Sequence, residues 1–174
     1  MDVKSLHHVV YRCRDAKTTA DFYTKVLGLE YAMAVAEDRV PSTGEEHPYM
    51  HIFFRMDDGS YVAFFELPES PEMGRDPNTP AWVQHLALRV KDMKTLMAYK
   101  KKLEKLGIEV IGPTDHTICK SIYFFDPNGH RLELTVDCMT PKMKKDLSSV
   151  SEKMLKEWTK TKKAPRHADW VHKK

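Results

Sequence analysis

The stretch His8-Val-Val-Tyr-Arg-Cys-Arg-Asp15 recurs 77 residues later as His85-Leu-Ala-Leu-Arg-Val-Lys-Asp92. Each copy leads into a helix-like segment that ends at a glycine, Gly28 or Gly107, and then into three strand-like segments rich in Val, Ile, Phe and Tyr. A repeat of this length indicates one structural unit used twice. The sequence therefore predicts an α+β fold in which two tandem βαβββ modules form a curved mixed sheet around a cup, with a C-terminal helix added.

The two halves also resemble each other where they close. Ile52-Phe-Phe-Arg with Asp58-Gly59 matches Ile122-Tyr-Phe-Phe with Asn128-Gly129, and Phe65-Glu66-Leu67 is set beside Leu132-Glu133-Leu134. The Asp-Gly and Asn-Gly pairs are typical of hairpin turns. We therefore predict a first module at 5–67, a proline-rich linker at 68–81, a second module at 82–137, and a C-terminal helix and basic tail at 140–174.

The C-terminal segment is basic but amphipathic. Residues 141–174 contain 11 Lys and Arg against 4 Asp and Glu. Thr140-Pro141 is a suitable helix start, and an apolar stripe follows at helical spacing. We expect a helix at 141–163 whose stripe packs on the core or on a partner subunit, with the charges on a solvated face rather than on nucleic acid. The stripe consists of Met143, Leu147, Val150, Met154 and Trp158.

The composition fits a globular protein, with 41% hydrophobic and 30% charged residues. No apolar run approaches the roughly 20 residues that span a bilayer, and the first residues lack the apolar core of a secretory signal. We expect a cytoplasmic protein without a membrane partner. The three cysteines, Cys13, Cys119 and Cys138, form no CxxC pair, which favours reduced thiols.

Strand alternation indicates which polar residues share a face. His8 and His85 lie in the first strand of each half, and Glu66 and Glu133 in the closing strands. If these four residues line one concave side, they form two equivalent His/Glu pairs. Two imidazoles and a carboxylate suit a mid-row divalent metal, and this set is typical of non-haem Fe(II) enzymes.

These motifs resemble the vicinal oxygen chelate superfamily, which includes extradiol dioxygenases, glyoxalase I, methylmalonyl-CoA epimerase, and fosfomycin- and bleomycin-resistance proteins. The resemblance covers about residues 5–137. It depends on Leu6-His7-His8-Val9, Asp21-Phe22-Tyr23 with Leu27-Gly28-Leu29, Gln84-His85-Leu86-Ala87, and Tyr123-Phe-Phe-Asp-Pro-Asn-Gly-His-Arg-Leu-Glu133.

The resemblance implies that His8, His85 and Glu133 bind one divalent metal, with Fe(II) expected, and that His7 does not. It implies a small-molecule substrate with two adjacent oxygens, and a ring-cleaving dioxygenase acting on a catechol-like compound. Tyr123 is then expected to face the substrate, and His116 is a candidate acid/base. Candidate aromatic linings of the cup are Phe54, Phe64 and Phe125.

Two alternatives stay open. Glu66 matches a fourth ligand and proton carrier of glyoxalase I, which would make the protein an isomerase, epimerase or lyase that uses Mn, Zn, Ni or Co. A bleomycin-resistance-type protein would instead bind a drug in the cup without metal. Family habit also implies a homodimer.

Overall fold

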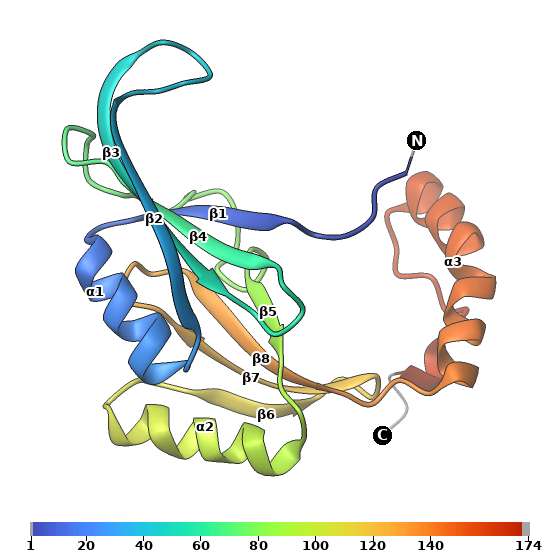
Figure 1. Ribbon diagram of the computed structural model, residues 1–174. Helices are drawn as coiled ribbons and strands as arrows, with labels where there is room; N and C mark the ends of the chain where they lie inside the picture. The colour runs from blue at the N-terminus through green and yellow to red at the C-terminus, as the bar shows by residue number, and fades with distance from the viewer. Residues whose placement is uncertain (1, 172–174) are drawn as a thin grey trace. The chain divides into compact units, whose positions relative to one another are not determined.

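The computed structural model describes residues 2–171, and in it each half of the chain forms a four-stranded sheet (Figure 1). The strand orders, β1-β4-β3-β2 and β5-β8-β7-β6, are equivalent. In each sheet the first and last strands of the module pair in parallel, as β1 with β4 and β5 with β8. The repeated βαβββ unit is thereby confirmed. The strands are β1 (His8–Cys13), β2 (Glu30–Arg39), β3 (Glu46–Arg55), β4 (Tyr61–Glu66), β5 (Leu86–Arg89), β6 (Ile111–Asp115), β7 (Cys119–Phe125) and β8 (Arg131–Asp137).

The helices begin directly after the two repeated stretches, at Ala16 and Met93. Asp15 and Asp92 cap them by accepting hydrogen bonds from the backbone N–H groups of Thr18 and Thr95 at 2.6 and 2.8 Å. The first helix is α1 (Ala16–Asp21) continued by a π-helical turn η1 (Phe22–Val26), and the second is α2 (Met93–Lys105). Both are followed by a glycine in the left-handed region, with φ of 78° at Gly28 and 76° at Gly107.

The core of the first half lies between its helix and its sheet. Tyr23 of η1 packs on Phe54 and Phe64, with ring centroids 5.1 and 4.8 Å apart, and all three side chains are fully buried. The prediction that Phe54 and Phe64 line the substrate cup is therefore wrong. Both rings belong to the hydrophobic core beneath η1.

By compactness the chain divides into two units: residues up to 85 with 125–131, and residues 86–124 with those from 132 onward. The loop between β7 and β8 therefore packs with the first half. Asp126 accepts a hydrogen bond from the Tyr23 hydroxyl at 3.2 Å, Asn128 accepts one from the Arg14 amide at 2.9 Å, and His130 Nε2 donates to the Arg12 carbonyl at 2.6 Å.

The second unit carries α3 (Pro141–Thr161), capped by Thr140 as predicted. None of its described residues is buried, and Trp158 is 47% exposed. The predicted apolar stripe is therefore at most half-buried, and its packing on a partner subunit stays a prediction.

The chain then folds back through the short helix η2 (Asp169–Val171), and the Thr117 hydroxyl donates to the Val171 carbonyl at 2.6 Å. The last three residues of the predicted tail, 172–174, lie outside the described residues. Across the described part of the chain, no helix is both long and apolar enough to cross a membrane. All three cysteines are free.

Candidate metal and substrate site

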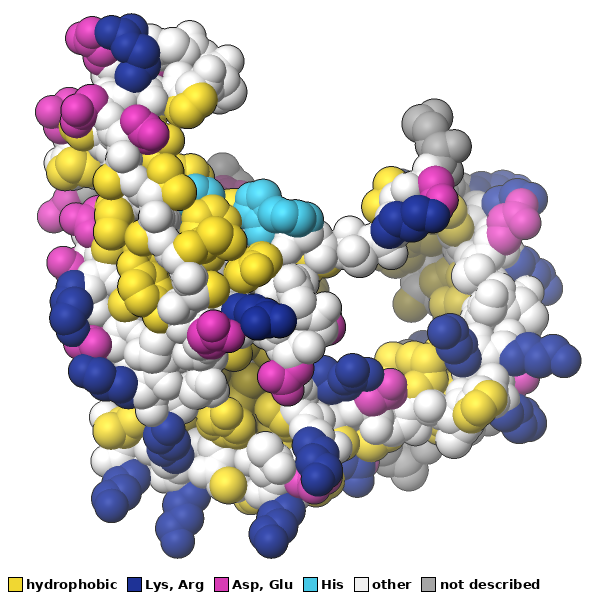
Figure 2. Space-filling view, in the orientation of Figure 1, with side chains coloured by type: hydrophobic (Ala, Val, Ile, Leu, Met, Phe, Trp, Pro, Cys, Tyr) yellow, Lys and Arg dark blue, Asp and Glu magenta, His cyan; other side chains and the backbone are white. Residues whose placement is uncertain are grey.

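The first sheet presents one face that carries His8. The register pairs His8 with Tyr61, Val10 with Ala63 and Arg12 with Phe65, and it pairs Phe65 in turn with His51 on β3. Because side chains alternate along a strand, these residues point to the same side of the sheet. We call this side the His8 face; it comprises His8, Val10, Arg12, His51, Phe53, Tyr61, Ala63 and Phe65. In Figure 2 histidine side chains lie beside a broad hydrophobic patch.

His8 is exposed at the start of β1. Its Nδ1 lies 2.7 Å from Nδ1 of His7, so one ring donates and the other accepts. Nδ1 is therefore engaged by the neighbouring side chain, and Nε2 is the nitrogen suited to a metal.

His51 is a polar residue of the His8 face that sequence analysis missed. Its ring stacks on Phe65 at a centroid distance of 3.7 Å and lies 6.4 Å from the His8 ring. Its buried Nε2 has no hydrogen-bond partner among the described residues. Burial, and then the nearby His8, lower the pKa of His51 and favour the neutral imidazole. Alternation along β3 from His47 through Tyr49 was the signal that could have found it.

His85 lies directly before β5 and is exposed. Its Nδ1 donates to the Val83 carbonyl at 3.0 Å, which leaves Nε2 as the unprotonated nitrogen of the neutral ring. A histidine that binds metal through one nitrogen commonly donates the other N–H to a carbonyl in this way. The local geometry of His85 thus fits the predicted role.

Glu133 lies on β8 and is only 6% exposed. Its Cα partner on β5 is Ala87, two residues after His85. Glu133 also lies beside Tyr123, whose pKa is raised first by burial and then by the negative charge of this carboxylate. Glu133 is thus a buried carboxylate with the Tyr123 phenol as a neighbour, and its role as a metal ligand stays a prediction.

His116 and Tyr123 come together in the second unit. His116 Nε2 lies 2.8 Å from the Tyr123 hydroxyl, and the two rings meet edge to face. The predicted acid/base and the predicted substrate-facing tyrosine are therefore direct neighbours. Such a pair can relay a proton: the phenol gives its own proton to the imidazole while it takes one from a third group, and so stays neutral.

Phe125 continues the line of Tyr123 along β7 and is 38% exposed. The Arg75 guanidinium lies over its ring, 4.5 Å from the centroid. One side of Phe125 is thus covered by a cation–π contact.

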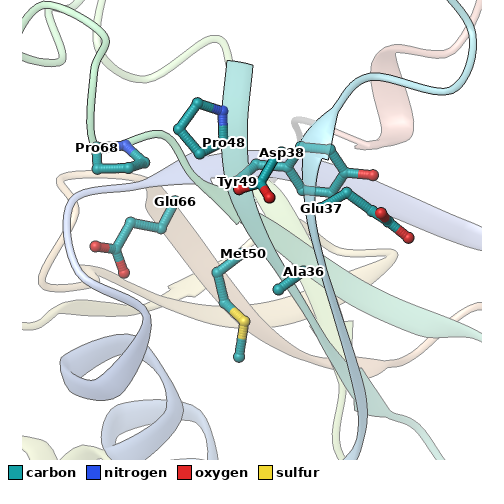
Figure 3. A pocket seen from close by; sticks show the side chains of 8 residues that line it. All are labelled: Ala36, Glu37, Asp38, Pro48, Tyr49, Met50, Glu66 and Pro68. Carbon is teal, nitrogen blue, oxygen red and sulfur yellow. The ribbon is translucent and has the colours of Figure 1, made fainter. Parts of the chain in front are cut away.

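Glu66 does not share a face with His8. Its Cα partner on β1 is Cys13, which lies on the opposite side of the sheet. Its carboxylate accepts a hydrogen bond from the Ala16 amide at 2.6 Å, at the start of α1. Figure 3 shows it in a cavity of about 470 Å³, with the carboxylates of Glu66 and Glu37 at opposite ends. The prediction of two equivalent His/Glu pairs in one cup is wrong.

The error lies in how the repeat was aligned. Counting from Gly59 and Gly129 gives an offset of 70 residues, which sets Ala63 beside Glu133 and Val136 beside Glu66. The register agrees, because Ala63 pairs with Val10 as Glu133 pairs with Ala87. The similar Phe-Glu-Leu and Leu-Glu-Leu sequences are therefore not structurally equivalent.

The three predicted ligands belong to different compact units, with His8 and His85 in the first and Glu133 in the second. Within residues 2–171, no group of three or more His, Cys, Asp or Glu side chains is assembled that could hold a metal ion.

Comparison with known proteins places this geometry in context. Residues 5–134 match the family model described as the Glyoxalase/Bleomycin resistance protein/Dioxygenase superfamily. The chain is 29% identical over 141 residues to a Bacillus subtilis protein named "Putative ring-cleaving dioxygenase MhqA", covering 79% of this chain but only 42% of that protein. It is 26% identical to a 2-epi-5-epi-valiolone epimerase from Actinomyces sp., covering 75% of this chain and 78% of the epimerase.

A solved structure shows the same fold. The fosfomycin resistance protein FosX from Listeria monocytogenes, in complex with Mn(II) and sulfate, has a TM-score of 0.57 and 18% identity. The alignment covers 82% of this chain and 98% of FosX. At this identity the likeness concerns the fold alone.

Proposed function

Because the chain belongs to the Glyoxalase/Bleomycin resistance protein/Dioxygenase superfamily, we propose that it is a metal-dependent enzyme, and specifically a non-haem Fe(II) ring-cleaving dioxygenase. The substrate is a catechol-like small molecule with two adjacent oxygens. A ring carbon–carbon bond beside the diol breaks and both atoms of O2 enter the product, so the reaction needs no external reductant.

The position of Glu66 is the observation that favours a dioxygenase over a glyoxalase-type enzyme. Its carboxylate lies on the face away from His8 and accepts the Ala16 N–H. That removes the carboxylate a four-ligand, glyoxalase-type site would require. The proposed set is then His8, His85 and Glu133, two imidazoles and one carboxylate, which suits Fe(II) with positions left for substrate.

The donor set fits such an ion. The Nδ1 of His85 donates to a backbone carbonyl, as is common for histidines that bind a metal. The Nδ1 of His8 is hydrogen-bonded to His7. When bound, a divalent metal supplies Lewis acidity and a template for the two substrate oxygens, and iron adds redox chemistry.

The second unit supplies the proton-handling groups. The diol's proton reaches His116 through Tyr123: the hydroxyl oxygen of Tyr123 takes it while Tyr123 passes its own proton to His116 Nε2, and the relay later runs in reverse. Tyr123 is neutral before and after this step, because the ordinary pKa of a phenol is about 10 and burial raises it further. It therefore orients the substrate as a neutral hydrogen-bond donor.

Metal analysis of protein purified without oxygen, followed by oxygen uptake with a panel of catechols, tests the proposal. We expect iron in the wild type, and its loss in His8→Ala, His85→Ala and Glu133→Ala. The control is His7→Ala, which keeps all three ligands and should keep its metal. Full metal content in His85→Ala, or no oxygen uptake with iron bound, would reject the dioxygenase. A cytoplasmic location and a homodimer stay predictions alongside it.

A further inference from the structure

A second cavity lies on the His8 face itself. It has a volume of about 650 Å³ and is formed wholly by the first unit. Val10, Phe65 and Leu67 give it an apolar wall, and Arg12, His47 and Tyr49 give it a polar side. A volume of this size falls in the range of roughly 300–1,000 Å³ typical of small-molecule sites.

The cavity extends the His8 face along β1. Val10 and Arg12 follow His8 by two and four residues and point to the same side. Four residues of strand at a rise of about 3.3 Å each place Arg12 about 13 Å from His8. A single catechol ring held at His8 would not reach the far end of this cavity.

Arg12 marks that far end. Its Nη2 donates to the Pro71 and Ser70 carbonyls at 2.6 and 3.4 Å, so the linker holds the guanidinium in place. His47 is fixed on the same linker, with Nε2 2.9 Å from the Ser70 hydroxyl. The polar end of the cavity is therefore preorganised.

Within residues 2–171, no carboxylate neutralises the charge on Arg12. Its buried Nε has no hydrogen-bond partner, and no described carboxylate forms an ion pair with it, although Glu45 also lines the cavity. A half-buried cation without a counter-charge is costly, and a carboxylate is the group that its planar donors fit best.

We propose that this cavity binds an apolar arm of the substrate that ends in a carboxylate near Arg12. This proposal rests on the proposed function, and it defines the substrate class as catechol-like diols that carry a long acidic side chain. The diol lies toward His8, the apolar arm lies along Val10 and Phe65, and the carboxylate lies at Arg12.

Calorimetric titration of metal-free protein with 6-phenylhexanoate and with its uncharged amide tests the cavity without metal. The acid should bind about 10- to 100-fold more tightly than the amide, as expected for a charge-assisted hydrogen bond. Arg12→Met should remove that difference, Val10→Trp should weaken both ligands by filling the cavity, and Arg14→Met is the matched control that changes neither.

Equal binding of acid and amide to the wild type would overturn the proposal, even if Arg12→Met failed to fold. Oxygen uptake then separates the two hypotheses. If the acid binds through Arg12 but no catechol consumes oxygen, the cavity stands and the dioxygenase fails. If catechol and an acid-armed catechol show the same kcat/KM, the dioxygenase stands and the cavity proposal fails.

Discussion

The two halves of the chain share a backbone plan but present different chemistry on the equivalent face. In the first half that face carries Phe53 and Ala63; at the equivalent positions the second half has Tyr123 and Glu133. The first is an apolar floor with a cavity, and the second holds a buried carboxylate, a phenol and His116. The two halves thus differ in the chemistry of this face, which is mainly apolar in the first half and carries titratable side chains in the second.

The largest expected effect tests whether the hydrophobic cores of the two halves are equivalent. Phe54 and Phe124 occupy matching core positions and are 0% and 2% exposed. Replacing either by Ala should lower the free energy of unfolding by about 3–5 kcal/mol, because a large cavity is left. Urea denaturation measures both. A harmless Phe124→Ala would break the structural equivalence.

The next test sharpens the difference between the two glutamates. Glu133→Gln should weaken metal binding by more than the ~10–100-fold that loss of a supporting partner costs. Glu66→Gln should keep the metal and lose only about 1 kcal/mol of stability, because an amide oxygen still accepts at the start of α1. Metal titration and thermal unfolding of the two variants measure these effects. Loss of metal in Glu66→Gln would support a site with Glu66 as a fourth ligand.

A smaller effect is expected at the phenol. Tyr123→Phe removes the hydroxyl that contacts His116 while keeping the ring. We expect kcat for oxygen uptake to fall by about tenfold, less than the ~10²–10⁴-fold of a complete loss of acid/base catalysis, because His116 remains. Metal content should be unchanged. A loss of metal would show that Tyr123 supports Glu133 instead.

The smallest effect concerns the matching helix caps, where the halves should again agree. Backbone hydrogen bonds, from Thr18 to Asp15 and from Thr95 to Asp92, lower the pKa of each carboxyl below its usual value. Each charged cap therefore contributes stability above about pH 4, which is lost as the pH falls through the lowered pKa. In Asp15→Asn and in Asp92→Asn, the melting temperature should fall slightly less steeply with decreasing pH than in the wild type. The change should be equal in the two variants. Different slopes would show that the caps are not equivalent.

Local signals in the sequence were enough for the architecture but not for the faces. Asp15, Gly28 and Thr140 act within one turn, so their roles follow from residue type. The face of Glu66 depended on aligning two closing strands, and a shift of three residues moves a side chain to the other side of a sheet. Phe54 and Phe64 were misplaced for a related reason, since aromatic residues occupy both faces of the first sheet.

Long-range contacts account for the rest. His116 and Tyr123 were both expected in the site, but their contact depends on the turn between β6 and β7. His51 was missed because its importance comes from its neighbours across the sheet, Phe65 and His8. Nothing in the local sequence indicated that the segment before Val171 would return to Thr117.

The loop at 125–131 has a consequence for how the protein folds during synthesis. Hydrogen bonds tie this loop to residues far earlier in the chain. Asp126 bonds to Tyr23, 103 residues before it. Asn128 bonds to Arg14 and His130 to Arg12, 114 and 118 residues before them. At about 5–20 residues per second, a ribosome needs roughly 5–20 s to make the intervening chain. During that interval the first helix is complete but its polar partners do not yet exist. The first half therefore reaches its complete hydrogen-bond pattern only after residues 125–131 have been made.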